Sequence, residues 1–379
     1  MRKALFTVNV AARWAGAMFS AMSMVSMASD AAESPKAREL SSSRLCEASA
    51  ALVIECPGTN DRRCLLVGDN EQEKRLFWFK LSDDGDVDVK TMQELKVTPN
   101  EVKIGDIEAL AKLPNGRIVA FGSHSRNTKC QAEADRKTFG VIKQLTKKSA
   151  LVQITTTTSM DCDTLLGANR AKTSLSEAAC SAIVEAEKAA KQVEDSFEAR
   201  KLSKDEAERQ CNTKEAYNAE GAVNVAKKGK PNIWIGLRAP LLPPRAETNR
   251  LAILMHLKGL DAYSFDKVAA LDLDGHGIRE LAYDGTDGVV WVIAGPPQDL
   301  GEKEDVKFQL WKFDAKKLDA NAIIKPERVR ADLPTSSEGL ALLNDRFIVL
   351  VDGGETKGKD ECEQPAGFLI LPRPPLTPR

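Results

Sequence analysis

Short runs of apolar residues separated by turns recur along the chain, and a charged residue stands at the start of each repeat. Glu108, Glu220, Arg279 and Glu338 each lead into such a run. The last three are equally spaced, whereas the interval from Glu108 to Glu220 is nearly twice as long, and a looser copy begins at Glu47, close to one period before Glu108. Four-stranded units at a fixed period are typical of β-propellers. The pattern therefore predicts an all-β, five-bladed propeller.

The predicted domain organisation follows from this period. It comprises a lead-in over 29–45 that includes a strand closing the last unit, the propeller over 46–372, and a Pro-rich tail over 373–379. A strand from the lead-in would supply the fourth strand that the last unit lacks, and it would hide an open sheet edge.

The apolar period changes between residues 173 and 218. Apolar residues there recur at helical spacing, and Ser174 with Glu177 and Ser203 with Glu206 form capping-box pairs. This pattern predicts a helical hairpin inserted between two blades. The alternative is a sixth, degenerate blade, because the long interval between the second and third repeats is close to two periods.

The first 28 residues have the pattern of a secretory signal peptide. Arg2 and Lys3 give a positive start, residues 14–25 are apolar but too short to span a bilayer, and Ser-Met-Ala at 26–28 suits cleavage. A buried N-terminal helix is the alternative. We expect a periplasmic or secreted protein without a membrane span.

Eight cysteines are consistent with an oxidising compartment. Their spacing suggests the pairs Cys56–Cys64, Cys130–Cys162, Cys180–Cys211 and Cys46–Cys362. Metal binding by thiolates is the alternative, which the absence of any Cys-x-x-Cys and the presence of only three histidines disfavour.

The charged residues of the repeats are expected to meet at one end of the propeller. Because adjacent strands of a blade are antiparallel, the start of each first strand lies beside the end of the second. This mouth would gather Asp69, Asn70, Glu71, Asp106, Glu108, Ser123, His124, Arg126, Glu220, Arg238, Arg279, Glu280, Glu338 and Asp352. Such a set can bind a polar or anionic small ligand, or it can lock neighbouring blades through backbone hydrogen bonds.

The enzymatic hypothesis gives several of these residues a role. Glu220 and Glu338 would be metal ligands or bases, His124 an acid/base, and Arg238 and Arg279 clamps for an anion. The predicted ligand contacts are Asp69, Asn70, Glu71, Glu108, Arg126, Arg238, Arg279 and Asp352. With 54 basic and 55 acidic residues, the chain lacks the basic excess typical of proteins that bind nucleic acid.

A turn before the fourth repeat has the spacing of a calcium loop. Asp272, Asp274 and Glu280 stand at positions one, three and nine, although His276 replaces the expected acid at position five. Calcium is therefore the cofactor that the sequence suggests, and a tight turn without metal is the alternative.

These motifs together resemble a bacterial family known as domain of unknown function 3616. The resemblance covers residues 46–372 and rests on Gly-Asp-Asn-Glu at 68–71, Asp-Ile-Glu-Ala-Leu at 106–110, His-Ser-Arg at 124–126, Ile-Gly-Leu-Arg-Ala-Pro-Leu-Leu at 235–242, Gly-Ile-Arg-Glu-Leu at 277–281 and Ala-Gly-Pro at 294–296. It implies export and a propeller-like fold, and it brings no known activity.

Two functional hypotheses follow. The first is an exported propeller that binds a small ligand at its mouth and acts as a metal-dependent hydrolase of phosphoesters or lactones, classes suggested by a looser similarity of the Glu-Gly-Leu motif to phytase and lactonase propellers. The second is a non-catalytic binding or scaffold protein of the envelope, whose hairpin at 173–218 contacts a protein partner. Mouth acids that converge around a cation would favour the first hypothesis. Mouth acids that all pair with arginines or with backbone groups would favour the second.

Overall fold

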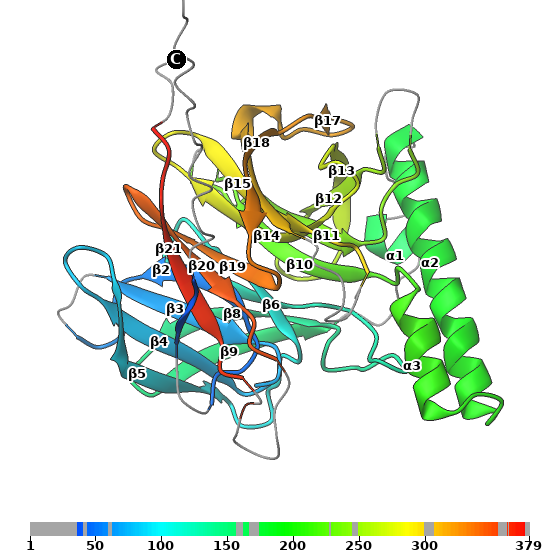
Figure 1. Cartoon of the computed structure of the whole chain (residues 1–379), viewed down its shortest axis with the longest axis horizontal. Coiled ribbons are helices and arrows are strands. Elements are labelled where there is room, and N and C mark those ends of the chain that lie inside the picture. The colour runs from blue at the N-terminus through cyan, green and yellow to red at the C-terminus, as the bar shows by residue number, and fades with distance from the viewer. Residues whose placement is uncertain are drawn as a thin grey trace, which may run out of the picture. The chain divides into compact units, whose positions relative to one another are not determined.

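The computed structural model describes residues 36–40, 44–59, 63–156, 162–166, 174–226, 229–244, 249–298, 307–354, 362 and 364–375. The predicted signal peptide at 1–28 lies outside these residues. The described part is an all-β fold with few helices (Figure 1). None of its helices combines the length and the apolar character that a membrane-spanning segment needs.

The strands of the described part of the chain form four sheets. We divide the eight-stranded sheet at its parallel pairing and so describe five units of mainly antiparallel strands. The first unit contains β2 (Ala48–Ile54), β3 (Cys64–Asp69), β4 (Arg75–Leu81) and β5 (Val87–Thr98). The second contains β6 (Ile107–Lys112), β7 (Ile118–Gly122), β8 (Thr138–Leu145) and β9 (Ser149–Thr156). A short parallel pairing of β5 with β9 joins these two units into one eight-stranded sheet.

The other three units follow the same plan. The third contains β10 (Asn218–Asn224), β11 (Ile233–Ala239), β12 (Ala252–Leu257) and β13 (Phe265–Leu271), with β17 (Ile323–Ile324) added at its edge. The fourth contains β14 (Gly277–Asp284), β15 (Val289–Gly295), β16 (Phe308–Asp314), which the 3-10 helix η1 (Ala315–Lys317) follows, and β18 (Glu327–Leu333). The fifth contains β19 (Ser337–Leu342), β20 (Arg346–Val351), β21 (Gly367–Pro372) and β1 (Arg38–Glu39).

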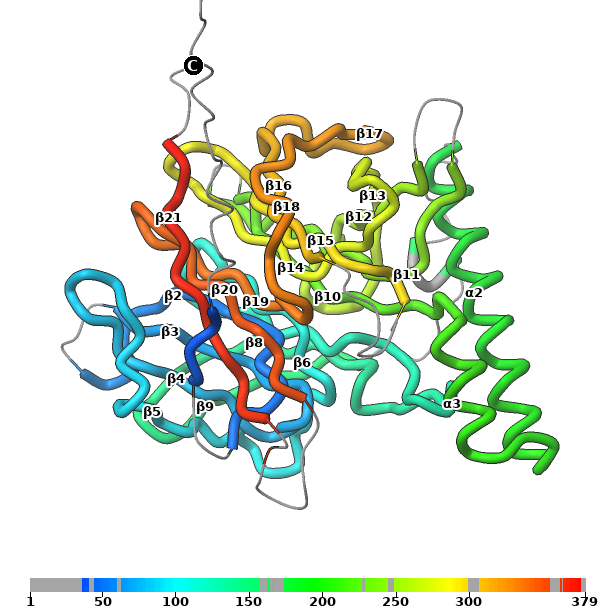
Figure 2. Tube along the Cα trace, viewed as in Figure 1, coloured from blue at the N-terminus to red at the C-terminus, as the bar shows by residue number. Residues whose placement is uncertain are grey.

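The first strands of the five units contact one another in a closed order, β2 to β6, β10, β14, β19 and back to β2 (Figure 2). Glycines in second strands allow this close approach. A Cβ atom on Gly68 would lie 2.7 Å from Ile107 of the next unit, and one on Gly236 would lie 2.6 Å from Ile278. Both isoleucines are fully buried. The result is a propeller-like arrangement of sheets around their first strands.

The two ends of the described chain meet in the fifth unit. Arg38 of β1 pairs with Phe368 of β21, so the fourth strand of this unit comes from the lead-in. The disulfide Cys46–Cys362 joins the segment before β2 of the first unit to the segment before β21 of the fifth unit. Gly353 N also donates to Cys46 O at 3.0 Å.

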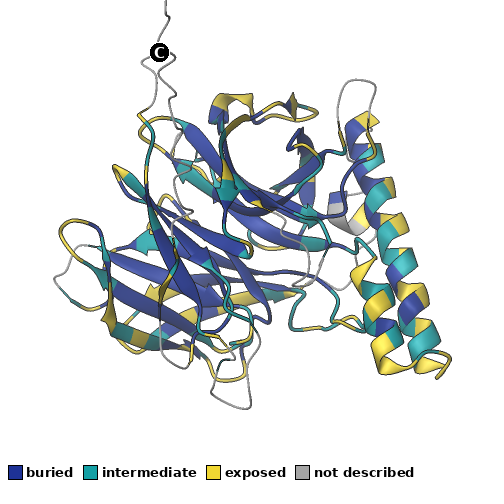
Figure 3. Cartoon of the chain, viewed as in Figure 1, coloured by how far each residue is buried: buried dark blue, intermediate teal, exposed yellow. Residues whose placement is uncertain are grey.

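The helices lie between β9 and β10 in the sequence. They are α1 (Cys162–Leu166), α2 (Ser174–Glu198) and α3 (Lys204–Asn212). Ser203 caps α3 by accepting a hydrogen bond from Glu206 N, as the capping box predicts. One face of α2, including Ala179 and Ile183, packs into the core of the second and third units, whereas the outer faces of the hairpin are exposed (Figure 3).

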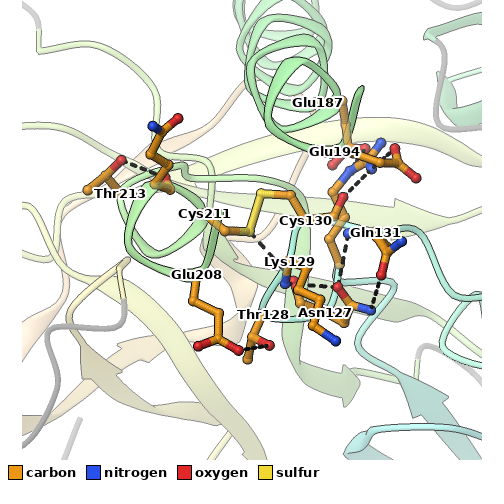
Figure 4. Close-up of a disulfide and its surroundings, with 12 residues drawn as sticks. Asn127, Thr128, Lys129, Cys130, Gln131, Glu187, Glu194, Glu208, Cys211 and Thr213 are labelled. Atoms are coloured by element: carbon orange, nitrogen blue, oxygen red, sulfur yellow. Dashed lines mark hydrogen bonds and ion pairs between the residues drawn. A yellow bond between two sulfur atoms is a disulfide. The ribbon is translucent and has the colours of Figure 1, made fainter. Parts of the chain in front are cut away.

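The disulfides correct two predicted cysteine pairs. Cys46–Cys362 and Cys56–Cys64 are found, but the structure pairs Cys130 with Cys211 and Cys162 with Cys180. The predictions Cys130–Cys162 and Cys180–Cys211 are wrong because the loop after β7 extends to α3, while Cys162 opens α1 beside α2. Figure 4 shows Cys130 and Cys211 joined next to Glu187 and Glu194.

Candidate functional site

Each first strand contains a β-bulge, and the five bulged residues form the centre of the candidate site. In the first four units the pairing register skips one residue of the first strand, which is Ser49, Glu108, Glu220 or Arg279. In the fifth unit it skips two residues, Glu338 and Gly339. A bulge bends its strand and re-aims a side chain. All five side chains are buried. We call this set the bulge ring.

The bulges also correct the sequence alignment of the first repeat. Ser49, not Glu47, is the residue equivalent to Glu108, because the bulge lies between Ala48 and Ala50. The interval from Ser49 to Glu108 is then the same as those between the third, fourth and fifth repeats. Ser49 donates to Ile107 O and carries no charge into the ring.

Four charged residues at the ring form a buried chain of ion pairs. Arg279 Nε lies 2.8 Å from Glu220 Oε2, and the same guanidinium donates to Glu338. Arg238 Nη1 donates to the other oxygen of Glu220 at 3.1 Å. The two predicted anion clamps therefore bind the two predicted bases. Because the pairs cross from the third to the fourth and fifth units, they also link those units.

Glu108 differs from the other glutamates of the ring. The residue is 6% exposed, and its side chain makes no hydrogen bond or ion pair with the described residues. Burial raises the pKa of its carboxyl well above the usual range; Asp106 and Glu220 raise it further, and the two arginines partly offset this. Glu108 is thus the buried acid of the ring that lacks a partner within the described structure.

Glu280 closes the ring from one side. At the position after the bulge, the other units have only small residues, Ala50, Ala109, Gly221 and Gly339. The Glu280 carboxyl accepts a hydrogen bond from Leu281 N at 2.8 Å. The backbones of Ala51 in β2 and Ala222 in β10 lie close enough to lower its pKa, so this β14 side chain reaches two other first strands. Burial holds its pKa well above the usual range, with Glu108 adding to the effect.

Asp106 organises the loop that follows β7. Its carboxylate accepts hydrogen bonds from Ser123 and, at 2.9 Å, from Ser125, and it lies 3.1 Å from Arg136 Nη1. Arg136 also donates to Ser125 Oγ at 2.9 Å. This compact network fixes the 123–136 loop on the second unit and occupies the Asp106 carboxylate.

A second group of acids lies at the seam between the first and last units. Asp69 accepts from the backbone N–H groups of Cys46 and Glu71, both at 2.9 Å, and burial raises its pKa to about 7. Burial raises the pKa of Glu47 to about 8, and the charges of Asp352, Glu71 and Asp69 add to this effect. We call Glu47, Asp69, Glu71 and Asp352 the seam acids. Asn70 lies close enough to Glu47 to lower its pKa and belongs to the same group.

His124 lies in an aromatic cluster rather than among the mouth acids. Its ring stacks on Tyr263 with centroids 3.9 Å apart, and its Nδ1 lies 2.9 Å from Gly122 O. The backbone φ of 58° turns the chain at this residue. Burial lowers the pKa of the imidazole to about 4, so it is neutral at physiological pH.

Arg126 holds the helical hairpin. Its guanidinium lies 3.0 Å from both Glu187 and Glu194 of α2, and it donates to Cys130 O at 2.7 Å. The sequence placed Arg126 among the ligand contacts because it follows β7. The spacing of Glu187 and Glu194, two turns apart on one face of the same helix, is the sequence signal that could have indicated this pairing.

The residues of the predicted calcium loop are not gathered around one point. Asp274 pairs with Arg328 at 3.1 Å, and Glu280 extends into the ring. Among the described residues there is no group of three or more His, Cys, Asp or Glu side chains that could hold a metal ion. Asp272 is buried at the end of β13.

The sequence matches a family model described as protein of unknown function (DUF3616) over residues 58–353. No curated protein matches. Similar solved structures include a GH43 β-1,3-galactosidase with galactodeoxynojirimycin, at 11% identity and a TM-score of 0.45 over 86% of this chain and 90% of that one. Pseudomonas fluorescens PhoX with vanadate has 9% identity and a TM-score of 0.41 over 87% and 89%. Likeness at this level carries no inference about activity.

Proposed function

The chain belongs to the DUF3616 family, and we propose that it is an extracytoplasmic binding protein that holds a small organic cation at the mouth of a five-bladed propeller. The observation that carries this proposal is Glu108, a buried carboxyl without a partner among the described residues in a ring whose arginines are already bound.

The number of blades rests on the bulges. One bulge per unit and the closed order of the five first strands support five blades. The long interval between the second and third repeats, which suggested a sixth blade, is accounted for by α1, α2 and α3, which occupy the chain between β9 and β10.

The charge of the ligand follows from the balance at the ring. Glu108, Glu220, Glu280 and Glu338 lie at the ring with Arg238 and Arg279. Glu220 and Glu338 pair with the arginines and Glu280 accepts from Leu281 N, which leaves the Glu108 carboxyl in excess. An ammonium or guanidinium group would pair with that carboxyl, and an anion would have to displace glutamates from the arginines. The ring thus favours a cation over the anionic ligand that the sequence suggested.

The disulfides support the proposed compartment. Four cysteine pairs account for all eight cysteines, and such bonds persist in oxidising environments. This chemistry supports a periplasmic or secreted location.

Titration calorimetry with methylammonium, choline, putrescine and arginine methyl ester tests the binding proposal. We expect saturable binding of at least one compound that strengthens as pH rises, because the cation needs the ionised Glu108 and displaces its proton. Glu108→Gln should lower the affinity at least about tenfold, the loss of about 1.4 kcal/mol. The exposed control Glu39→Gln should bind as wild type does. Absence of binding by all four compounds, or unchanged affinity in Glu108→Gln, would refute the proposal.

A hydrolase is the second candidate, because the raised pKa of Glu108 suits a general acid. On this hypothesis Glu220, Glu338 and His124 keep their predicted catalytic roles. The test is a screen of phosphomonoesters, phytate, esters and lactones, with Ca²⁺ or EDTA. Turnover that is lost in Glu338→Gln and in His124→Ala, with both variants folded, would establish the enzyme. A protein partner at the 173–218 hairpin stays a prediction, which a pull-down with the mature protein would test.

A further inference from the structure

A surface pocket of about 510 Å³ lies at the opposite ends of the strands from the mouth. Ile54 and Lys112, which end β2 and β6, line it together with residues of the 55–58 and 113–117 turns and the end of β8. The mouth residues stand at the starts of those same first strands. The pocket is therefore separate from the bulge ring.

Unpaired cations line this pocket. Lys112, Arg117 and Lys143 are among its lining residues, and none of them makes an ion pair with the described residues. Arg117 Nε is buried without a hydrogen-bond partner there. Glu55 is the one acid among the lining residues. The excess of two positive charges contrasts with the mouth, where each arginine is bound to a glutamate.

The two turns that line the pocket are held in place before any ligand arrives. The disulfide Cys56–Cys64 fixes the first turn. Asn115 Oδ1 accepts from Arg117 N at 3.2 Å in the second turn, and Lys112 O accepts from Asn224 Nδ2 at 2.8 Å. A preorganised site loses less conformational entropy when it binds.

We propose that this pocket binds the phosphate group of a small phosphorylated molecule. A guanidinium recognises an oxyanion through parallel N–H donors, and two lysines add point charges. A phosphate group carries between one and a half and two negative charges at neutral pH, about the excess on the pocket. A single carboxylate would leave one cation unmatched.

Titration calorimetry with inorganic pyrophosphate and inorganic phosphate tests this site in the oxidised full chain at about 50 mM salt, where charge pairing is only weakly screened. We expect one saturable site, with pyrophosphate bound more tightly than phosphate and acetate not bound. The double variant Lys112→Gln/Lys143→Gln should weaken pyrophosphate at least about tenfold. Arg117→Lys keeps the charge but loses the planar donors, and it should weaken binding by about fivefold or more.

Two matched controls separate this site from general charge and from the mouth. Lys90→Gln removes an exposed lysine outside the pocket, and Glu108→Gln alters the ring; both should bind pyrophosphate as wild type does. Thermal unfolding of each variant checks that it is folded. Absence of saturable pyrophosphate binding, or equal weakening by Lys90→Gln and the double variant, would overturn the proposal. Acetate bound as tightly as phosphate would also overturn it.

Discussion

Two adjacent residues in each first strand determine what lies at the centre of the molecule. The bulged residue carries a charge in four of the five units, and the next residue is Ala or Gly in all units except the one with Glu280. Large side chains at that second position would collide at the centre, where packing leaves little free volume. The Glu280 carboxyl therefore fills the space that four small residues leave, and its burial costs desolvation free energy.

At the residue scale, the seam acids make stability depend on pH. Glu47 has a pKa raised from 4.5 to about 8, so it binds a proton more tightly in the folded protein than in the unfolded one. Its contribution to stability is fully present below pH 4.5 and is lost as pH rises to about 8. Glu47→Gln should therefore unfold about 4 °C higher than wild type at pH 8.5, and at nearly the same temperature at pH 5.

Differential scanning calorimetry at pH 5 and 8.5 measures this effect. Glu39→Gln, an exposed change on β1, is the matched control and should follow the wild-type pH profile. If Glu47→Gln were no more stable than wild type at pH 8.5, the half-buried Glu47 carboxyl at the seam would not be the source of the pH dependence.

At the scale of elements, Arg126 is the polar anchor between the helical hairpin and the second unit. Its side chain is 10% exposed, and Glu187 and Glu194 are 16% and 12% exposed, so the contacts are largely shielded from water. Breaking a buried ion pair by removing one partner costs about 3–5 kcal/mol. Glu187 also accepts from Tyr217 N at 2.9 Å, which extends the anchor to the start of the third unit.

Arg126→Ala should loosen the hairpin while the sheets stay folded. We expect hydrogen exchange in α2 and α3 to accelerate by about tenfold or more, because opening no longer breaks two ion pairs, and exchange in β7 and β11 to change little. Hydrogen exchange with mass spectrometry measures both. Lys204→Ala, which removes an exposed pair with Glu208 on α3 and does not contact Glu187 or Glu194, is the control and should leave α2 near wild type.

The elements also show how far the sequence could predict the site. The repeat period located four of the five bulged residues, because a charge marks them. It missed Ser49, since a bulge is a property of strand pairing and an uncharged residue leaves no sign of it. His124 and Arg126 were assigned to the mouth by their position after β7, yet the left-handed turn at His124 directs the chain toward the hairpin. The sequence could not predict the ion-pair partners of Arg238 and Arg279, because these pairs depend on how three units are placed relative to one another.

At the scale of the whole molecule, one covalent bond joins residues near the two ends of the propeller-like fold. Cys46 and Cys362 are 316 residues apart, whereas Cys56 and Cys64 are 8 apart. A disulfide stabilises mainly by restricting the unfolded chain, and the effect grows with the logarithm of the loop length. The strand pair β1–β21 and the seam acids lie beside the long-range bond, so the two ends are held by covalent and non-covalent contacts together.

The two disulfides therefore form a matched pair for a test of ring closure. Cys46→Ser/Cys362→Ser should lower the free energy of unfolding by about 5 kcal/mol, and Cys56→Ser/Cys64→Ser by about 2–3 kcal/mol. Urea denaturation followed by tryptophan fluorescence measures both, and the midpoint should fall further for the first variant. Equal losses would mean that the long loop is already restricted in the unfolded protein. The Cys46–Cys362 bond would then add no more stability than the short-range bond, and the contacts between units would be what closes the ring.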